Sequence, residues 1–424
     1  MKIMNLALET MLEIEPPLEA SDQFLTNDEV ASVANIERGS ETTDELLDSV
    51  KTMQGINSSL QDNSVEGTIN PYAAGALNAA VEHLCLRAGV SVKQPFCLEQ
   101  LQGRISKQKA VGMAMESISE SIGAIISRIV AWIKKIYELV YDDIEDSLRG
   151  ATAVARRARR IQELAIIKQS TNVADSNKKP INKHHLVSYF NVDGKLLSFS
   201  EIESAYKHYS TEMNNSFSSN VLHNTLANVV NNMQQTVKQI GIGNYSAKEA
   251  LAASNAGVIY LKDHAFKNFK PTNPVNGNET ISYALPFGNA TILAVLGKED
   301  EYYNFVSVSL EQIHNTEGKD LPILTPKEVI DLTKMIESQM NSGLYHDHLK
   351  IKQQIKEIGK MVAKTCDSIT GSQSENGNEA IPSLHFLKSL TASLMMLTKI
   401  LYSYNGVMNR SVLSYCEASL DNWK

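Results

Sequence analysis

The sequence predicts a mainly helical protein with a small antiparallel β insert, an α+β fold overall. From residue 98 to about residue 170 there is no proline and little glycine, which is typical of long helices. Between residues 280 and 310, short runs of β-branched and aromatic residues alternate with Gly, Asn and Pro turns, which predicts strands. After Pro326 a helical pattern resumes and continues to the C-terminus.

The first 66 residues differ from the rest of the chain in charge. They hold 14 Asp and Glu residues against three Lys and Arg, a net charge of −11, whereas the whole 424-residue chain carries −8. Residues 67–424 are therefore slightly basic, at +3. The leader lacks long apolar runs, so we expect residues 1–66 to be an acidic, disordered and removable propeptide-like segment. An ordinary disordered acidic tail is the alternative interpretation.

Residues 67–171 are expected to form a helical domain of one or two long hairpins, with a new helix beginning near Asp142. Its most distinctive segment, residues 117–141, has isoleucines at three- and four-residue spacing, which predicts an amphipathic helix. A wide apolar face beside a tryptophan fits either a core helix or a helix that lies in a membrane interface. The members of this face are Ile122, Ile125, Ile126, Ile129, Trp132, Ile133 and Ile136.

An arginine cluster ends the predicted helix that follows this segment. Arg156, Arg157, Arg159 and Arg160 lie within five residues, which is more positive charge than a helix C-terminus needs. Such a cluster can hold the phosphates of a nucleic acid or a lipid, or it can be a solvated basic face. These four arginines are the candidate phosphate contacts.

Two further folded regions are expected after a polar connection. Residues 184–320 are predicted to form a mixed α+β domain that includes a hairpin about Asp193-Gly194. Residues 324–424 are predicted to form a C-terminal helical domain that opens on a capping box of Thr325 and Glu328. The strands of the mixed domain are predicted at residues 186–190, 196–199, 257–261, 280–285, 290–296 and 303–310.

No motif indicates catalysis, a cofactor or a metal. The cluster His346-Asp347-His348 and the pair His184-His185 lack the spacing at which helical side chains share a ligand. The sequence contains no phosphate-binding loop, zinc-protease motif or nucleophile elbow. It also has no run of about 18 uncharged apolar residues. We therefore expect a non-enzymatic protein without a cofactor or metal.

The combination of these features resembles a family. The acidic leader, the small-x-Glu tetrapeptide Ser64-Val65-Glu66-Gly67, the amphipathic helix around Trp132 and the helical tail at 411–420 are together similar to the internal head (core or inner-body) proteins of large tailed bacteriophages. The resemblance implies that the acidic propeptide targets the protein to the prohead, and that the phage maturation protease cuts after Glu in small-x-Glu motifs. It also implies packaging with the genome and, for some members, ejection into the host.

Carried onto this sequence, Ser64, Val65 and Glu66 would be the three residues before the cut, and Gly67 the residue after it. Gly39-Ser40-Glu41 is an alternative site, and the short pattern recurs elsewhere. Removing the leader would change the net charge from −8 to +3, which favours weak, non-specific association with packaged DNA. The other matches are Ala7-Leu8-Glu9, Ala114-Met115-Glu116, Ser309-Leu310-Glu311 and Gly377-Asn378-Glu379.

The expected partners are the prohead maturation protease, packaged DNA and other capsid or core proteins. The expected location is the interior of the phage head, after synthesis in the host cytoplasm. Two other functions stay open on the sequence. One is a membrane-active helical protein that contacts a membrane through residues 117–141, and the other is a non-catalytic scaffolding or host-interaction protein.

Overall fold

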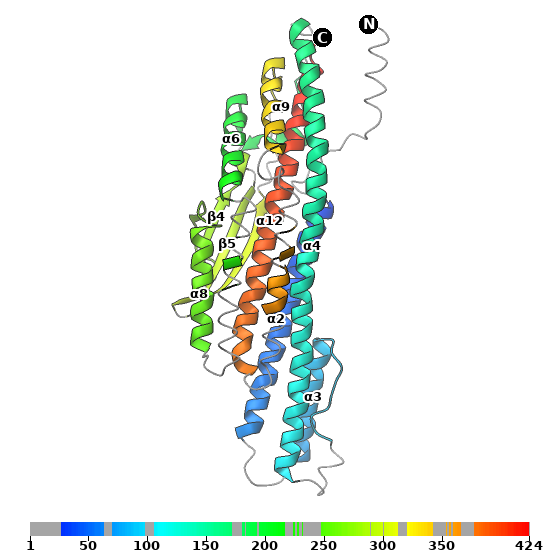
Figure 1. Ribbon diagram of the computed structural model, residues 1–424, viewed down its shortest axis with the longest axis vertical. Coiled ribbons are helices and arrows are strands. Elements are labelled where there is room, and N and C mark those ends of the chain that lie inside the picture. Colours follow the sequence, from blue (N-terminus) through cyan, green and yellow to red (C-terminus); the bar gives the residue numbers. More distant parts are fainter. Residues whose placement is uncertain are drawn as a thin grey trace.

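The molecule is an elongated helical bundle with a four-stranded sheet on its side and a separate two-stranded hairpin, as the computed structural model shows (Figure 1). This confirms the predicted fold class, mainly α with a small antiparallel insert. The structure describes residues 27–62, 70–97, 106–171, 180–182, 184–192, 195–216, 247–288, 290–299, 301–312, 320–341 and 377–423, with isolated positions between 224 and 231 and between 353 and 365.

The described elements alternate long helices with short strands. The helices are α2 (Asn27–Asp62), α3 (Pro71–Arg87), α4 (Lys107–Thr171), α5 (His184–Tyr189), α6 (Phe199–Ser216), α8 (Ala247–Asp263), α9 (Pro326–Met340) and α12 (Gly377–Leu420), with the short 3₁₀ turn η1 (Pro286–Gly288). The strands are β1 (Asn191–Val192), β2 (Lys195–Leu196), β3 (Lys270–Pro271), β4 (Glu279–Ala284), β5 (Ala290–Glu299) and β6 (Tyr302–Gln312).

Helix α4 is the longest element and runs along most of the bundle (Figure 1). Its 65 residues span about 97 Å at the rise of an α-helix. The prediction of hairpins in this region, with a new helix near Asp142, is wrong because the helix continues through that position. Between residues 107 and 171 there is no proline, and each glycine costs a helix only about 1 kcal/mol, so nothing in this sequence forces a break.

Helix α12 lies at the centre of the bundle. It contacts α2, α4, α8, α9 and strand β6, and nearly all of its described side chains are buried. Among the described helices it is the one long and apolar enough to cross a membrane, but 89% of its most apolar window is buried inside the protein. Its side chains between Met395 and Leu401 include several core residues that are at most 4% exposed: Met395, Met396, Leu397, Ile400 and Leu401. A helix that is apolar all round is typical of such a central position.

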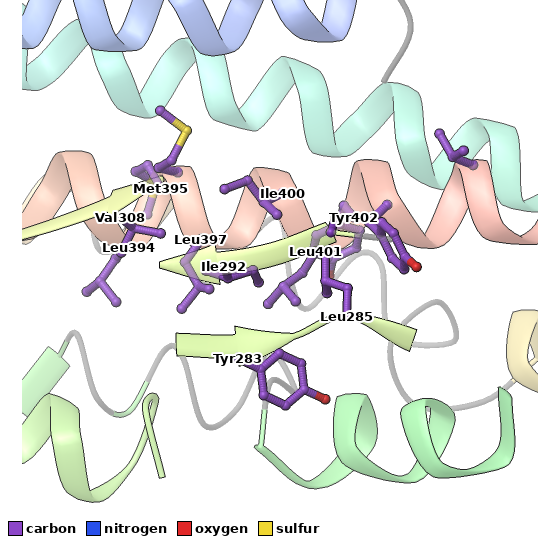
Figure 2. Packing of buried hydrophobic residues seen from close by; sticks show 14 of the residues in the cluster. Tyr283, Leu285, Ile292, Val308, Leu394, Met395, Leu397, Ile400, Leu401 and Tyr402 are labelled. Carbon is purple, nitrogen blue, oxygen red and sulfur yellow. The ribbon is translucent and has the colours of Figure 1, made fainter. Parts of the chain in front are cut away.

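The larger sheet is antiparallel, with the strand order β3-β4-β5-β6. Its three longer strands confirm the predictions for residues 280–310. Ile292 of β5 is in register with Tyr283 of β4 and Leu310 of β6, so these residues lie on one face. Figure 2 shows Ile292 beside Leu397 and Leu401 of α12, which therefore covers this face.

Two predicted strands are helical in the structure. The run at 186–190 lies mostly in α5, and the run at 257–261 lies in α8. Short apolar runs occur in buried helical turns as well as in strands, so the pattern alone does not separate the two. The strands β1 and β2 form a hairpin around Asp193-Gly194, although the turn residues themselves lie outside the described residues.

The capping box predicted at the start of α9 is confirmed. Thr325 Oγ1 accepts a hydrogen bond from the Glu328 backbone N–H at 3.3 Å, and the Glu328 carboxylate accepts one from the Thr325 backbone N–H at 2.7 Å. Pro326 occupies the first turn, where the absence of an N–H costs nothing. The sequence therefore fixes where this helix begins.

One continuous hydrophobic core joins the regions that the sequence divides into domains. It extends from Leu46 in α2 through α4 and the sheet to Leu420 in α12. Helix α4, from the region 67–171, packs on both α9 and α12, from the region 324–424. The division into domains stays a prediction, and packing is continuous across its boundaries.

Part of the predicted leader is a folded helix. Residues 27–62 form α2, and its side chains Leu46, Leu47, Val50 and Met53 are at most 8% exposed. The expectation of a solvated leader is corrected for these residues, whereas residues 1–26 and 63–66 lie outside the described residues. The physical reason is that a few apolar residues at helical spacing can bury a stripe even where the net charge is strongly negative.

Candidate functional site: the helix before the predicted cleavage site

The preferred cleavage residues lie between two helices. Ser64-Val65-Glu66-Gly67 falls between the end of α2 at Asp62 and the N-cap of α3 at Asn70, and it lies outside the described residues. The alternative Gly39-Ser40-Glu41 lies inside α2. There Gly39 packs so closely against the Trp132 ring that a Cβ atom would collide with the indole. That segment would have to leave its helix before a protease could bind it as an extended chain.

Helix α2 runs antiparallel to the N-terminal half of α4. Two contacts define this alignment: Gly39 lies against Trp132, and Asn57 Nδ2 donates a hydrogen bond to Ser119 Oγ at 3.4 Å. The isoleucines of the predicted amphipathic face are 0–7% exposed, and Trp132 is half-buried. The six buried isoleucines are Ile122, Ile125, Ile126, Ile129, Ile133 and Ile136.

This burial bears directly on the membrane alternative. The isoleucine face is a packing surface inside the bundle, where it shares one core with the buried side chains of α2. Membrane contact through residues 117–141 would require the bundle to open and α2 to leave. Of the two interpretations open on the sequence, the core helix is the one seen in this structure.

A fully buried lysine lies beside α2. The Lys388 side chain, on α12, is 0% exposed, and its Nζ lies 2.6 Å from Asp44 Oδ2 on α2. Burial lowers the pKa of Lys388, and the interaction with Asp44 opposes this shift. Among the residues that the structure describes, Asp44 is the one carboxylate within 4 Å of this ammonium. A buried charge without a partner is costly in free energy. Asp44 therefore offsets the cost of burying the Lys388 ammonium beside α2.

His385 completes this cluster. It lies three residues before Lys388 on the same face of α12, and its Nε2 is 3.7 Å from Asp44 Oδ1. Its ring lies 5.8 Å, between centroids, from that of Phe305 on β6. Burial is the main cause that lowers the pKa of His385 below 6.5, and the charge of Lys388 lowers it further. The cluster therefore connects α2, α12 and the sheet.

Helix α2 also forms one wall of a pocket of about 420 Å³. Ser40 and Glu41 line it on the α2 side, opposite residues 305–309 of β6 and Ser389 of α12. Ser393 Oγ, another lining residue, donates a 2.7 Å hydrogen bond to the Val306 carbonyl, which fixes α12 against β6. The lining combines serine hydroxyls and the Glu41 carboxylate with apolar side chains of β6 and α12.

The second half of α4 carries the arginine cluster, and Arg157 is engaged within the protein. Its Nε and Nη2 donate to the two carboxylate oxygens of Glu417 on α12, at 2.9 and 2.6 Å. Nη2 also donates to Ser414 Oγ at 3.1 Å. A forked contact of this kind fixes the guanidinium in one orientation, so Arg157 joins α4 to α12.

Arg159 makes a similar contact with α9. Its Nε and Nη2 both donate to Glu337 Oε1, at 3.1 and 2.6 Å, and the hydrogen bond with Glu337 is the main cause that raises the pKa of Arg159. Arg156 and Arg160 are exposed on the helix. Two of the four candidate phosphate contacts therefore already have carboxylate partners, and they hold the bundle together.

Metal and histidine sites are not assembled in the described part of the chain. No group of three or more His, Cys, Asp or Glu side chains gathers there in a way that could hold a metal ion. The cluster His346-Asp347-His348 and the side chains of His184-His185 lie outside the described residues. Cys85, Cys97 and Cys416 are free thiols.

Sequence reasoning missed the cluster of Asp44, His385 and Lys388. One signal was present, because Lys388 stands in the run Phe386-Leu387-Lys388-Ser389-Leu390, whose apolar residues predict burial and hence a counter-ion. The sequence does not indicate which carboxylate supplies it. Asp44 is distant along the chain and is one of 14 acidic residues in a segment that the net charge marks as solvated.

Comparison with known proteins identifies the family. The sequence model of the phiKZ-like phage internal head proteins matches residues 28–418, from the second residue of α2 to two residues before the end of α12. No curated protein and no solved structure matches the chain. The family is a structural one, and its members lie with other capsid or core proteins in the head interior. The chain belongs to the phiKZ-like phage internal head proteins, made in the host cytoplasm and located inside the virion.

Proposed function

We propose that this internal head protein is a non-enzymatic structural component that the prohead maturation protease cuts after Glu66 and that is then packed with the genome. One observation carries the proposal. The tetrapeptide Ser64-Val65-Glu66-Gly67 coincides both with the end of the acidic leader and with the interval between α2 and α3. The elongated bundle supports lateral packing against other core or capsid proteins (Figure 1).

The position of this tetrapeptide favours it over other small-x-Glu matches. The matches at 39–41, 114–116 and 309–311 lie within α2, α4 and β6, and the match at 377–379 begins α12. Proteases cut most readily where the backbone is exposed outside regular elements. Residues 64–67 fall in the interval between the last residue of α2, Asp62, and the N-cap of α3, Asn70.

The N-terminus and intact mass of the protein from purified virions test the proposed cut. A chain that begins at Gly67 supports it, whereas a chain that begins at Met1 contradicts it. A start after Glu9 or Glu41 would support processing and contradict the site. Presence of the protein in mature virions also separates an internal protein from a scaffold, because a scaffold leaves the capsid.

Matched phage variants sharpen this test. With Glu66→Gln we expect virions that carry the uncut chain, because the residue before the cut has lost its carboxylate. Glu116→Gln changes another small-x-Glu match, inside α4, and should leave the N-terminus at Gly67. Normal cutting of the Glu66→Gln chain would exclude this site.

Weak association with packaged DNA is the second part of the proposal. It is supported by the exposed Arg156 on α4 and by the charge of +3 on residues 67–424, which applies to the body once the leader fragment has dissociated. Binding of virion-derived protein to duplex DNA should weaken as salt increases, because phosphate contacts release counterions. Arg156→Gln should reduce the salt slope by about 1. Binding without salt dependence would contradict phosphate contact.

Ejection into the host is the third part, and the family resemblance is what supports it. Infection with phage that carry the isotopically labelled protein tests it. Label recovered from the host cytoplasm together with the injected genome supports ejection. Label that stays quantitatively in the empty capsids outside the cell contradicts it.

A further inference from the structure

The surface beneath α2 has two chemically different parts. One is the isoleucine face of α4, whose side chains share a core with Leu46, Leu47, Val50 and Met53 of α2. The other is the edge of α12 that carries Lys388 and His385. Without α2, both the isoleucine face of α4 and Lys388 would become exposed to solvent. The surface therefore matches a helix with one apolar stripe and one carboxylate.

Lys388 determines the required carboxylate. Its side chain is 0% exposed, so an apolar or cationic helix in the place of α2 would leave its ammonium without a counter-ion. Asp44 supplies this group at 2.6 Å. Asp48, one turn further along α2, is exposed and forms no ion pair with Lys388. The two aspartates thus form a matched pair for experiment, alike in charge and helix but different in contact.

The family match provides an independent observation. The matched range begins at residue 28, one residue after α2 begins, although the acidic leader extends to residue 66. All of helix α2 except its first residue therefore lies inside the sequence pattern of the family, and residues 1–27 precede the matched range. The match thus covers α2 together with α4 and α12, the helices that α2 packs on.

We infer that the α4–α12 surface is a binding site for the leader helix α2, and that α2 stays bound there non-covalently, through Asp44 and Lys388, after the chain is cut between α2 and α3. The mature protein would then consist of two chains that remain together. That the chain is cut at all between α2 and α3 rests on the proposed cleavage after Glu66. The binding itself does not, so the two can be tested separately.

The test uses the full chain with the recognition sequence of a site-specific protease placed between Asp62 and Asn70. After complete cutting, size-exclusion chromatography and intact mass spectrometry show whether the N-terminal fragment elutes with the body. We expect co-elution at micromolar concentration. Separation of the fragment from a body that stays folded by circular dichroism would overturn the inference.

Substitutions test the role of the buried pair. Asp44→Asn should weaken retention of the cut fragment by about 100-fold, because Lys388 loses its counter-ion. Asp48→Asn should leave retention unchanged. The double variant Asp44→Leu with Lys388→Met should restore retention, because no buried charge remains. Retention of the Asp44→Asn fragment as tight as that of the unmodified chain would overturn the role of this pair.

Failure of this inference is distinguishable from failure of the proposed cleavage. If virion protein begins at Met1 but the engineered cut leaves the fragment bound, the cleavage proposal fails and the binding site stands. If virion protein begins at Gly67 and the fragment separates in solution, the cleavage proposal stands and this inference fails.

Discussion

The two halves of α4 are held to their neighbours in different ways. The first half packs an isoleucine face under α2, beside an ion pair whose lysine side chain is 0% exposed. The second half is joined to α9 and α12 by arginine–carboxylate pairs, in which the Arg159 and Arg157 side chains are 63% and 21% exposed. Water can solvate the second set if a partner is lost, but not Lys388. Loss of the single pair beside α2 should therefore have a larger effect on stability than loss of either arginine pair.

The largest expected effect follows from breaking, in the intact chain, the pair between the buried Lys388 and Asp44, whose own side chain is 45% exposed. Asp44→Asn should lower the free energy of unfolding by roughly 3 kcal/mol, because Lys388 remains buried without a counter-ion. Asp44→Leu combined with Lys388→Met should recover most of this loss. Chemical denaturation measures all three variants. Equal stability of Asp44→Asn and the exposed control Asp48→Asn would remove the distinction between the two halves.

The contact between α2 and Trp132 should give the next effect. Gly39→Ala places a methyl group against the indole and should destabilise the protein by about 1–3 kcal/mol, with a change in tryptophan fluorescence. Gly55→Ala, on the same helix with open space around it, should instead stabilise by up to about 1 kcal/mol through helix propensity. If both substitutions change stability in the same direction, the close packing of α2 on α4 is wrong.

The surface pairs of the second half should contribute less. Arg157→Ala should cost about 1 kcal/mol, since it removes a forked contact with Glu417 that is partly shielded from water. Arg159→Ala should cost less than Arg157→Ala, because the Arg159 side chain is 63% exposed and solvent screens its charge, although the Glu337 side chain is 23% exposed. Thermal unfolding of the two variants under one set of conditions compares them. A larger loss of stability for Arg159→Ala than for Arg157→Ala would contradict this ranking of the two pairs.

The smallest expected effect is a dependence on pH that involves His385. Its pKa in the folded protein is below 6.5, so the unfolded chain binds a proton more readily as the pH falls through that value. The contribution of neutral His385 is complete above pH 6.5 and is lost as the pH falls toward the folded pKa. Lys388, Asp44, Lys51 and Asp48 act on this ring. His385→Gln should flatten the stability profile below pH 6.5. An unchanged profile would contradict a contribution of His385 to this pH dependence.

Much of the fold was predictable because its signals are local. The capping box at Thr325 and the strands at 280–310 depend on neighbouring residues, and both are confirmed. The isoleucine spacing of α4 predicted a buried or membrane-facing stripe without saying which. That choice depends on α2, which lies elsewhere in the sequence.

The candidate site was less predictable because its signals are tertiary. Leu46, Val50 and Met53 have helical spacing, but a net charge of −11 over the leader obscured this stripe. The partner of Lys388 is set by how α2 lies on α12, which no local pattern encodes. The arginine cluster was visible in the sequence, and the carboxylates that engage Arg157 and Arg159 were not.

The short connection between Asp62 and Asn70 has a consequence for the effective concentration of α2. While the chain is intact, a short link keeps α2 near its surface at an effective concentration in the millimolar range, so a helix that leaves rebinds at once. After a cut, occupancy follows the bulk concentrations of fragment and body. A crowded head would keep the surface filled, and dilution into a host cell would empty it. Cleavage would thus make the binding of α2 sensitive to dilution without altering any contact between α2 and the body.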